Sequence, residues 1–314
     1  MTGTPLGPGG EFDMIREMLS RWGSLARGIG DDAALVDVPS GSRLVVSTDT
    51  SVENVHFRRA SLSPEEIAYR AVAAAMSDLA AMAATPLGII IALTLTDAWR
   101  AAVPALADGI AAASRELGAP ILGGDVTRGG ELAIAVTVLG SVEHPLLRSG
   151  ARAGDTLWVT GHLGGTLRAF RALESGKIPA PAHRAKFAHP VPRLHEARWL
   201  AARNATAAID CSDGIAADAS HLAAASGVRV VLDLDRLPLA EGATPQDAAT
   251  SGEEYELIVT APATLDRAAF EREFGIPVTA VGRVEAMESG AAGVETYSGG
   301  ARVPLPRGHS HFSG

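Results

Sequence analysis

The sequence predicts an α/β protein built from two domains. Short β-branched or apolar runs alternate with longer helix-like runs along the whole chain. The chain has 314 residues, 47% of them hydrophobic, which is enough to form two cores. A turn-rich stretch, HPLLRSGARAGD at 144–155, divides it into comparable halves. We therefore predict domains at 1–144 and 145–314.

Each expected strand is an apolar or β-branched run bounded by Gly, Pro or Asp. These runs are 33–38, 44–48, 88–95, 131–140, 156–160, 206–210, 228–233, 255–260 and 278–284. Helical spacing and end signals predict helices at 12–20, 64–83, 99–117, 164–175, 193–203, 214–226 and 264–274. Asp78 and Pro86 interrupt the apolar stretch 71–95, which therefore predicts a helix followed by a strand and no membrane span.

Composition excludes several classes of protein. The formal net charge of −9 argues against a nucleic-acid partner, because such partners need a basic surface. A single cysteine, Cys211, excludes an intramolecular disulfide and suits a reducing compartment. The opening residues MTGTPLGPGGEF lack the features of a signal peptide. These observations predict a soluble cytoplasmic protein.

Aspartates recur at expected strand ends and beside glycines, where open α/β sheets place ligands. They are Asp31 and Asp32 after GIG, Asp49 after LVVST, Asp78, Asp125 after ILGG, and Asp210 and Asp213 around CS. Taken singly, each is more typical of a turn or a helix cap than of a ligand site. Asp78 differs, because its helix is apolar nearly all round and a buried carboxylate needs a cation.

A metal ion is the simplest partner for these carboxylates. The only lysines are Lys177 and Lys186, and neither lies in or near an acidic motif of the sequence. Carboxylates with Ser and Thr hydroxyls favour Mg²⁺ or Mn²⁺ over Zn²⁺. No P-loop or protein-kinase signature is present. Arg148 is a candidate phosphate clamp, although a surface arginine is about equally probable on composition alone.

Eight motifs in order and spacing resemble those of the thiamine-monophosphate kinase family, within the wider aminoimidazole ribonucleotide synthetase superfamily. They are GIGDDAALV, STDTSVENVHF, SDLAAMAATP, GGDVTRG, LRSGARAGD, IDCSDGIAADASHL, SGEEYEL and the terminal HF. The resemblance covers roughly residues 10 to 312. Their combination is specific, although each motif alone is not.

The resemblance implies the two-domain aminoimidazole ribonucleotide synthetase-like fold with mixed sheets, in a homodimer. The 1–144 domains would bind metal and ATP and pair into a barrel across the dimer, while 145–314 would complete the ATP and substrate cleft. The implied reaction moves the γ-phosphoryl group of ATP directly, in line and with several Mg²⁺ ions, onto thiamine monophosphate. It yields thiamine diphosphate and needs no general base or protein nucleophile, because the acceptor oxygen is already anionic.

The resemblance also implies roles for individual residues. The implied metal ligands are Asp32, Ser47, Thr48, Asp49, Asp78, Asp125, Asp210 and Asp213. ATP contacts would come from Gly124, Asp125, Arg148 and Ser212, and thiamine-phosphate contacts from His56 and Glu253.

Three residues depart from the family pattern. In the usual GGEDYEL motif, Ser251 replaces a glycine and Glu254 an aspartate. Pro306 stands where many members carry a tryptophan that stacks on thiamine, which leaves His56, Phe57, His311 and Phe312 as candidate walls for the rings. Two alternatives remain open at this point: another ATP-using enzyme of the superfamily, and a non-catalytic metal-nucleotide sensor.

Overall fold

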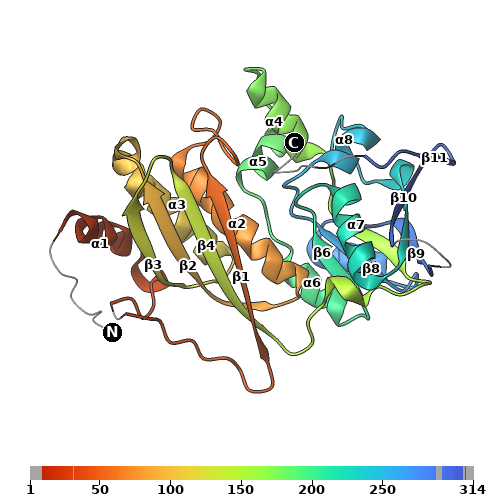
Figure 1. Ribbon diagram of the computed structural model, residues 1–314, viewed down its shortest axis with the longest axis horizontal. Helices are drawn as coiled ribbons and strands as arrows, with labels where there is room; N and C mark the ends of the chain where they lie inside the picture. The colour runs from red at the N-terminus through yellow and green to blue at the C-terminus, as the bar shows by residue number, and fades with distance from the viewer. Residues whose placement is uncertain (1–8, 31, 288–291, 307, 309–314) are drawn as a thin grey trace. The chain divides into compact units, whose positions relative to one another are not determined.

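The computed structural model describes residues 9–30, 32–287, 292–306 and 308. The chain divides into two compact units, each with its own sheet (Figure 1). Unit 1 comprises Met1–Leu79 and Ala84–His144, and unit 2 comprises Ala80–Ala83 and Pro145–Gly314. Within the described ranges, no helix is both long and apolar enough to cross a membrane.

Unit 1 carries a four-stranded mixed sheet with the order β1-β4-β2-β3. β4 pairs antiparallel with β1 and β2, and β3 pairs parallel with β2. Its elements are α1 (Gly10–Trp22), η1 (Gly23–Leu25), β1 (Arg43–Val52), α2 (Pro64–Ala81), β2 (Thr85–Leu95), η2 (Asp97–Ala102), α3 (Val103–Glu116), β3 (Ile121–Arg128) and β4 (Ala133–Val142).

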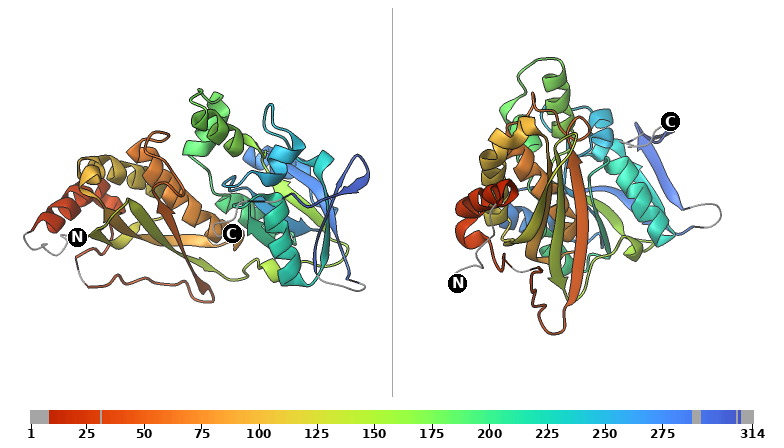
Figure 2. Two further views of the ribbon diagram at one scale, coloured as in Figure 1. Left: turned by 45° about the horizontal axis from the view of Figure 1, so that its top comes forward. Right: turned by 60° about the vertical axis from the view of Figure 1, so that its left-hand side comes forward.

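The core of unit 1 lies between one face of this sheet and helices α2 and α3 (Figures 1 and 2). Alternate residues of β4, including Val136 and Val138, are fully buried on that face. Gly109 of α3 lets this helix pack closely on α2. A Cβ built there would lie only 2.1 Å from the carbonyl oxygen of Glu65. The opposite face leaves Leu44 and Val46 about half exposed, at 49% and 55%.

The expected strand at 33–38 is wrong. Residues 34–39 have no regular secondary structure, and Leu35 is 99% exposed. The pattern of apolar residues suits a strand, but a strand also needs a partner edge for its backbone hydrogen bonds. In the described part of unit 1, this segment has no such partner in the sheet.

Unit 2 is built on a seven-stranded mixed sheet with the order β11-β10-β7-β9-β5-β8-β6. Its strands are β5 (Thr156–Thr160), β6 (Ala207–Asp210), β7 (Arg229–Asp233), β8 (Leu257–Ala261), β9 (Val278–Glu285), β10 (Gly293–Ser298) and β11 (Ala301–Val303). Its helices are η3 (Arg148–Gly150), α4 (Gly165–Glu174), α5 (Pro181–Ala188), α6 (Leu194–Ala201), α7 (Ile215–Ser226), η4 (Leu234–Arg236), α8 (Pro245–Thr250) and α9 (Arg267–Phe274). Buried residues of α7 pack on the sheet in one apolar cluster. This cluster holds the end of β6 in place, where the acidic residues begin.

Candidate functional site

The acidic residues of unit 2 lie in a loop between strand β6 and helix α7, which we call the acidic loop (residues 210–214). Asp210 is the last residue of β6 and is buried, while Ser212 and Asp213 are partly exposed. Gly214, at φ 111°, makes the turn into α7. The loop therefore places two carboxylates and a hydroxyl at one end of the unit 2 sheet.

Asp218, a residue that the sequence analysis did not select, holds the acidic loop in shape. Its Oδ2 accepts hydrogen bonds from the backbone N–H groups of Ser212, Asp213 and Gly214 at 3.0–3.1 Å. Burial and the neighbouring charges of Asp210 and Asp213 raise the pKa of Asp218 to about 8. Its position one turn into α7 was the available sequence signal, because acidic residues there bind free N–H groups.

A second loop, residues 251–256, lies directly against the acidic loop, and we call it the glutamate loop. The N–H of Glu253 donates to the carbonyl oxygen of Ser212 at 2.7 Å, and the N–H of Tyr255 donates to that of Cys211 at 2.9 Å. Glu253 and Tyr255 both have positive φ, 56° and 51°. A Cβ built at Gly252 would lie 2.8 Å from the Ser212 carbonyl oxygen, so this approach requires glycine.

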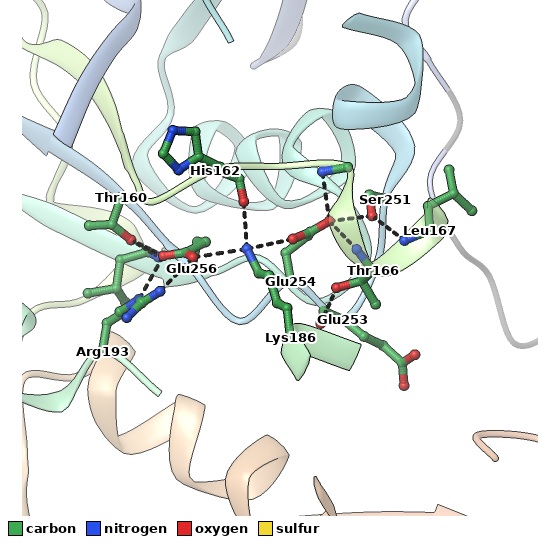
Figure 3. A network of polar contacts seen from close by, with 12 residues as sticks. Thr160, His162, Thr166, Leu167, Lys186, Arg193, Ser251, Glu253, Glu254 and Glu256 are labelled. Carbon is green, nitrogen blue, oxygen red and sulfur yellow. Dashed lines mark hydrogen bonds and ion pairs between the residues drawn. The ribbon is translucent and has the colours of Figure 1, made fainter. Parts of the chain in front are cut away.

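Charged side chains behind the glutamate loop form a buried network (Figure 3). Lys186 Nζ lies 2.7 Å from Glu254 Oε2 and 3.0 Å from Glu256 Oε1, and donates to the carbonyl oxygen of His162. Arg193 binds both oxygens of Glu256 at 2.7 Å. In Figure 3 the carboxylate of Glu253 points away from this network. The network therefore supports the glutamate loop from the side away from the Glu253 carboxylate.

The network keeps its members charged. Burial by itself raises the pKa of Glu256, but Lys186 and Arg193 outweigh it and lower the pKa to about 2. Burial opposes the charge of Lys186 as well, yet Glu256 and Glu254 raise its pKa above the ordinary value. Lys186 lies far from any acidic motif along the sequence, but not in the folded chain. The fold brings it against Glu256, 70 positions away.

Cys211, between Asp210 and Ser212, is fully buried. Burial, followed by the negative charges of Asp218, Glu254 and Asp210, raises the pKa of its thiol well above the ordinary value. A buried thiol held in its neutral form is a poor nucleophile.

In unit 1, three of the predicted residues lie on the helix-facing side of the sheet. Ser47 Oγ donates to Asp78 Oδ2 of α2 at 2.5 Å. Asp49 lies two residues further along β1 and therefore on the same face. The carboxylate of Asp78 thus has a hydroxyl donor, a partner that the sequence analysis did not pair with it.

Thr48 and Asp125 lie on the opposite face of that sheet. Thr48 accepts a hydrogen bond from Thr137 at 3.2 Å. Asp125 is exposed and pairs with Ala92 of β2. Both side chains therefore lie on the face of the sheet opposite the helices, which we call the outer face. The described unit 1 therefore does not gather all its predicted metal ligands on one face.

The strand pairing by itself explains why residue 124 is a glycine. A Cβ built there would lie 2.0 Å from the carbonyl oxygen of Ile91 on β2. The β2–β3 pairing therefore requires glycine at this position, whatever its relation to a nucleotide.

His56 follows β1 in a tight turn. The N–H of Val52 donates to His56 Nδ1 at 3.0 Å. In the neutral ring, this hydrogen bond places the proton on Nε2. The ring is thus a donor through Nε2, as a phosphate contact requires.

Two predicted residues stand apart from these groups within their own units. Asp32 is an exposed residue in a bend of unit 1. Arg148 is exposed in η3, and its neighbour Leu147 pairs with Ala207, at the start of β6. Since Asp210 ends that strand, Arg148 and the acidic loop are separated by the length of β6, about 10 Å.

The C-terminal segment approaches the acidic loop. A Cβ built at Gly308 would lie 2.4 Å from the carbonyl oxygen of Asp213. Pro306, at the place of the family tryptophan, is buried. Asp31, His311 and Phe312 lie outside the described residues.

Oxygen ligands predominate in both units, which fits a hard cation such as Mg²⁺. Among the described residues, however, no group of three or more His, Cys, Asp or Glu side chains could hold a metal ion by itself. Mg²⁺ in phosphoryl-transfer enzymes is commonly held by one or two carboxylates together with substrate phosphates. The donor atoms of the predicted ligands thus suit a hard cation that takes further oxygen ligands from elsewhere.

Comparison with known families matches both units. The profile of "AIR synthase related protein, N-terminal domain" matches residues 30–142. The profile of "AIR synthase related protein, C-terminal domain" matches residues 152–295.

Curated relatives match over most of the chain. The chain is 33% identical to thiamine-monophosphate kinase of Salmonella typhimurium over 97% of this chain and 98% of that protein. It is 33% identical to thiamine-monophosphate kinase of Bacillus subtilis over 73% of this chain and 74% of that protein.

Solved structures agree in fold. The crystal structure of thiamine-monophosphate kinase from Stenotrophomonas maltophilia has a TM-score of 0.81 at 33% identity, covering 94% of this chain and 98% of that one. AaThiL complexed with AMPPCP and TMP has a TM-score of 0.76 at 28% identity, covering 99% and 100%. The hydrogenase maturation protein HypE of E. coli, at 19% identity and a TM-score of 0.77, covers 94% and 96% and shows the fold alone.

Proposed function

Because this chain belongs to the thiamine-monophosphate kinase family of AIR synthase related proteins, it is a kinase, and we propose the following reaction and mechanism for it. The γ-phosphoryl group of ATP passes directly to a phosphate oxygen of thiamine monophosphate, giving ADP and thiamine diphosphate. The relative complexed with AMPPCP and TMP supports this pair of substrates, since AMPPCP is an ATP analogue with a non-cleavable bond.

The observation that carries the proposal is the docking of the glutamate loop on the acidic loop. It brings Asp210, Ser212 and Asp213 to the same end of the unit 2 sheet as Glu253. Oxygen ligands for a metal–phosphate complex therefore lie next to a carboxylate that can meet the cationic thiazolium ring of the acceptor. Backbone hydrogen bonds fix this arrangement before any substrate binds, which lowers the cost of ordering it.

The chemistry needs positioning more than proton transfer. The attacking phosphate oxygen is anionic, so no residue has to remove a proton from it. Cys211 is buried with a neutral thiol, which supports transfer without a phosphorylated protein intermediate. His56 Nε2–H would donate to the acceptor phosphate, and Arg148 and Ser212 to the nucleotide.

Magnesium supplies the remaining charge when it is bound: it offsets the repulsion between the two phosphate groups and stabilises charge that develops during in-line transfer. The side chains proposed to hold it are Asp32, Ser47, Thr48, Asp49, Asp78, Asp125, Asp210 and Asp213. Their oxygen-only chemistry fits ions that bind together with the phosphates of ATP.

We further propose a homodimer in which the unit 1 sheets pair into a barrel. The outer face of the sheet carries Leu44 and Val46, about half exposed, opposite Ser141 and Leu139 of β4. β1 is also an edge strand of ten residues, and long exposed edges are usually covered in native proteins. Pairing two copies would cover both the apolar face and the edge.

The direct test is an assay of the purified full chain with ATP and thiamine monophosphate. We expect equal amounts of ADP and thiamine diphosphate by chromatography, and no product when EDTA removes the divalent metal. Unphosphorylated thiamine and an unrelated phosphate monoester serve as acceptor controls. ATP hydrolysis without thiamine diphosphate would contradict the proposed function.

Direct transfer makes a second prediction. With γ-labelled ATP and an acid quench, we expect no label on the protein, and Cys211→Ser is expected to keep most of the turnover, because the thiol stays neutral and buried. A burst of product accompanied by labelled protein would instead reveal a covalent intermediate.

A further inference from the structure

The two residues that depart from the usual GGEDYEL motif contact each other. Ser251 and Glu254 are both buried in unit 2. The hydroxyl of Ser251 donates to Glu254 Oε1 at 2.5 Å (Figure 3). Each departure therefore lies where the other can compensate for it.

Together these two side chains bind the N-terminal turn of helix α4. Glu254 Oε1 accepts from the N–H groups of Gly164 at 2.7 Å and Thr166 at 3.2 Å. Ser251 Oγ accepts from the N–H of Leu167 at 3.1 Å. The first N–H groups of a helix have no partner within the helix, and here the glutamate loop supplies the acceptors.

The other oxygen of Glu254 is bound as well. Lys186 Nζ lies 2.7 Å from Oε2, and the same ammonium contacts Glu256 Oε1. The carboxylate therefore spans two fixed groups, the α4 turn on one side and Lys186 on the other. An aspartate at this position would be shorter by one carbon–carbon bond, about 1.5 Å, and could not reach both in the present backbone.

Glu253, one of the two residues between Ser251 and Glu254, is held through both its N–H and its carbonyl oxygen. Its N–H donates to Ser212, and its carbonyl oxygen accepts from Thr166 Oγ1 at 3.4 Å. Its left-handed φ of 56° is uncommon for a residue other than glycine and persists only where the surroundings impose it. Ser251 and Glu254, on either side along the chain, are both held by the α4 turn.

We propose that Ser251 and Glu254 are a coupled pair of positioning residues that hold Glu253 toward the thiamine moiety of the acceptor. This inference rests on the proposed function, because it takes Glu253 as the acceptor contact. Its specific consequence is that returning both residues to the family motif costs less than the two single changes would cost if they were independent.

The test is a double-mutant cycle of wild type, Ser251→Gly, Glu254→Asp and the double variant. Glu254→Asp alone leaves the buried Ser251 hydroxyl without its acceptor, and Ser251→Gly alone leaves the Leu167 N–H without one. We expect each single change to raise KM for thiamine monophosphate about 10-fold while kcat and KM for ATP change less than about 3-fold. The double variant leaves no orphaned hydroxyl, although the Leu167 N–H still lacks its acceptor, so we expect its KM to rise about 10-fold and not by the product of the two single effects.

Asp266→Ala is the matched control for a loss of stability alone. Asp266 caps α9 in the same unit, where its Oδ1 accepts from the N–H of Ala269 at 2.9 Å. Its removal is expected to lower the melting temperature by about 2–6 °C and to leave KM for thiamine monophosphate unchanged.

The outcomes separate the two proposals. An active wild type with additive effects of the two changes, or with equal effects on both substrates, overturns the positioning role alone. A wild type that makes no thiamine diphosphate overturns the proposed function and the positioning role with it. Melting temperatures of the same four proteins then report whether the two side chains are coupled in the fold.

Discussion

Glu256 holds a negative charge in a place that water hardly reaches. It is 1% exposed, and its charge depends on Lys186 and Arg193. Losing one partner of such a group leaves an uncompensated buried charge, which costs more than the interaction itself contributes. The contribution of the Glu256 charge to the free energy of unfolding is therefore best measured through its dependence on pH.

The folded-state pKa of Glu256, about 2, lies below its ordinary value of 4.5. The folded protein thus binds fewer protons, so this stability is present above pH 4.5 and is lost as the pH falls toward 2. We expect Glu256→Gln to remove about 3 kcal/mol of that pH-dependent part. Denaturant unfolding at a series of pH values measures it, with the exposed Glu271→Gln as control. Parallel curves for wild type and Glu256→Gln would refute the charge assignment.

Asp49 and Asp125 are exposed residues of β1 and β3 whose proposed role is electrostatic. We expect Asp49→Asn or Asp125→Asn to lower kcat at least about 100-fold at saturating metal, because each removes a proposed metal ligand. The melting temperature should stay nearly unchanged, since neither side chain is buried in the described unit. Asp97→Asn, at an exposed ion pair with Arg128, is the control. Near-wild-type turnover in either variant would exclude it from the metal site.

At the scale of the elements, the pairing of β2 with β3 leaves no room for a side chain at one position of β3. The parallel pairing sets Gly124 against Ile91, where only 2.0 Å separates a built Cβ from a backbone oxygen. Because the backbone fixes the position of a Cβ and the oxygen is itself a backbone atom, a side-chain rotation cannot relieve the clash. The edge strand that carries Asp125 therefore depends on a residue without a side chain.

Gly124→Ala is accordingly expected to lower the free energy of unfolding by about 3 kcal/mol. Gly123→Ala is the matched control, since a Cβ built at Gly123 meets nothing within 4 Å. Equilibrium denaturation of both variants measures the difference. Equal stability of the two would mean that β3 can shift away from β2, contrary to the register described.

Local patterns predicted most of the elements but not every pairing. Strand runs such as 156–160 and 88–95 were found because their composition and flanking residues suffice to mark them. The run 33–38 has the same composition and forms no strand, because pairing depends on a partner that local sequence does not specify. The short helix α5, Pro181–Ala188, was missed since its residues show little helical periodicity.

In the candidate site too, local motifs could be predicted from the sequence, whereas contacts between distant residues could not. The motifs predicted which residues belong to the acidic loop, and the family they indicated is confirmed. They could not predict that Lys186 and Arg193 lie behind the glutamate loop, because these contacts join residues 63 and 70 positions apart. Asp218 was also missed, since its role depends on the turn of the loop over α7.

For the whole molecule, the outer face of the unit 1 sheet makes a prediction about assembly. If two copies pair through it, Val46→Glu places a charge in the interface and should convert the dimer to a monomer at micromolar concentration. Ile178→Glu is the control, because Ile178 is 96% exposed and belongs to unit 2, not to that sheet. Sedimentation velocity distinguishes the two species. A Val46→Glu protein that remains dimeric would place the interface elsewhere.

The state of the two lysines also determines how the protein meets amine-reactive reagents. Lys186 is paired with two glutamates that raise the pKa of its amine, so it has less of the reactive neutral form than an ordinary lysine. Lys177 is exposed just after helix α4. Of the lysine side chains, the folded protein thus offers a single one for coupling, and a fluorophore or surface support attached there leaves the buried network intact.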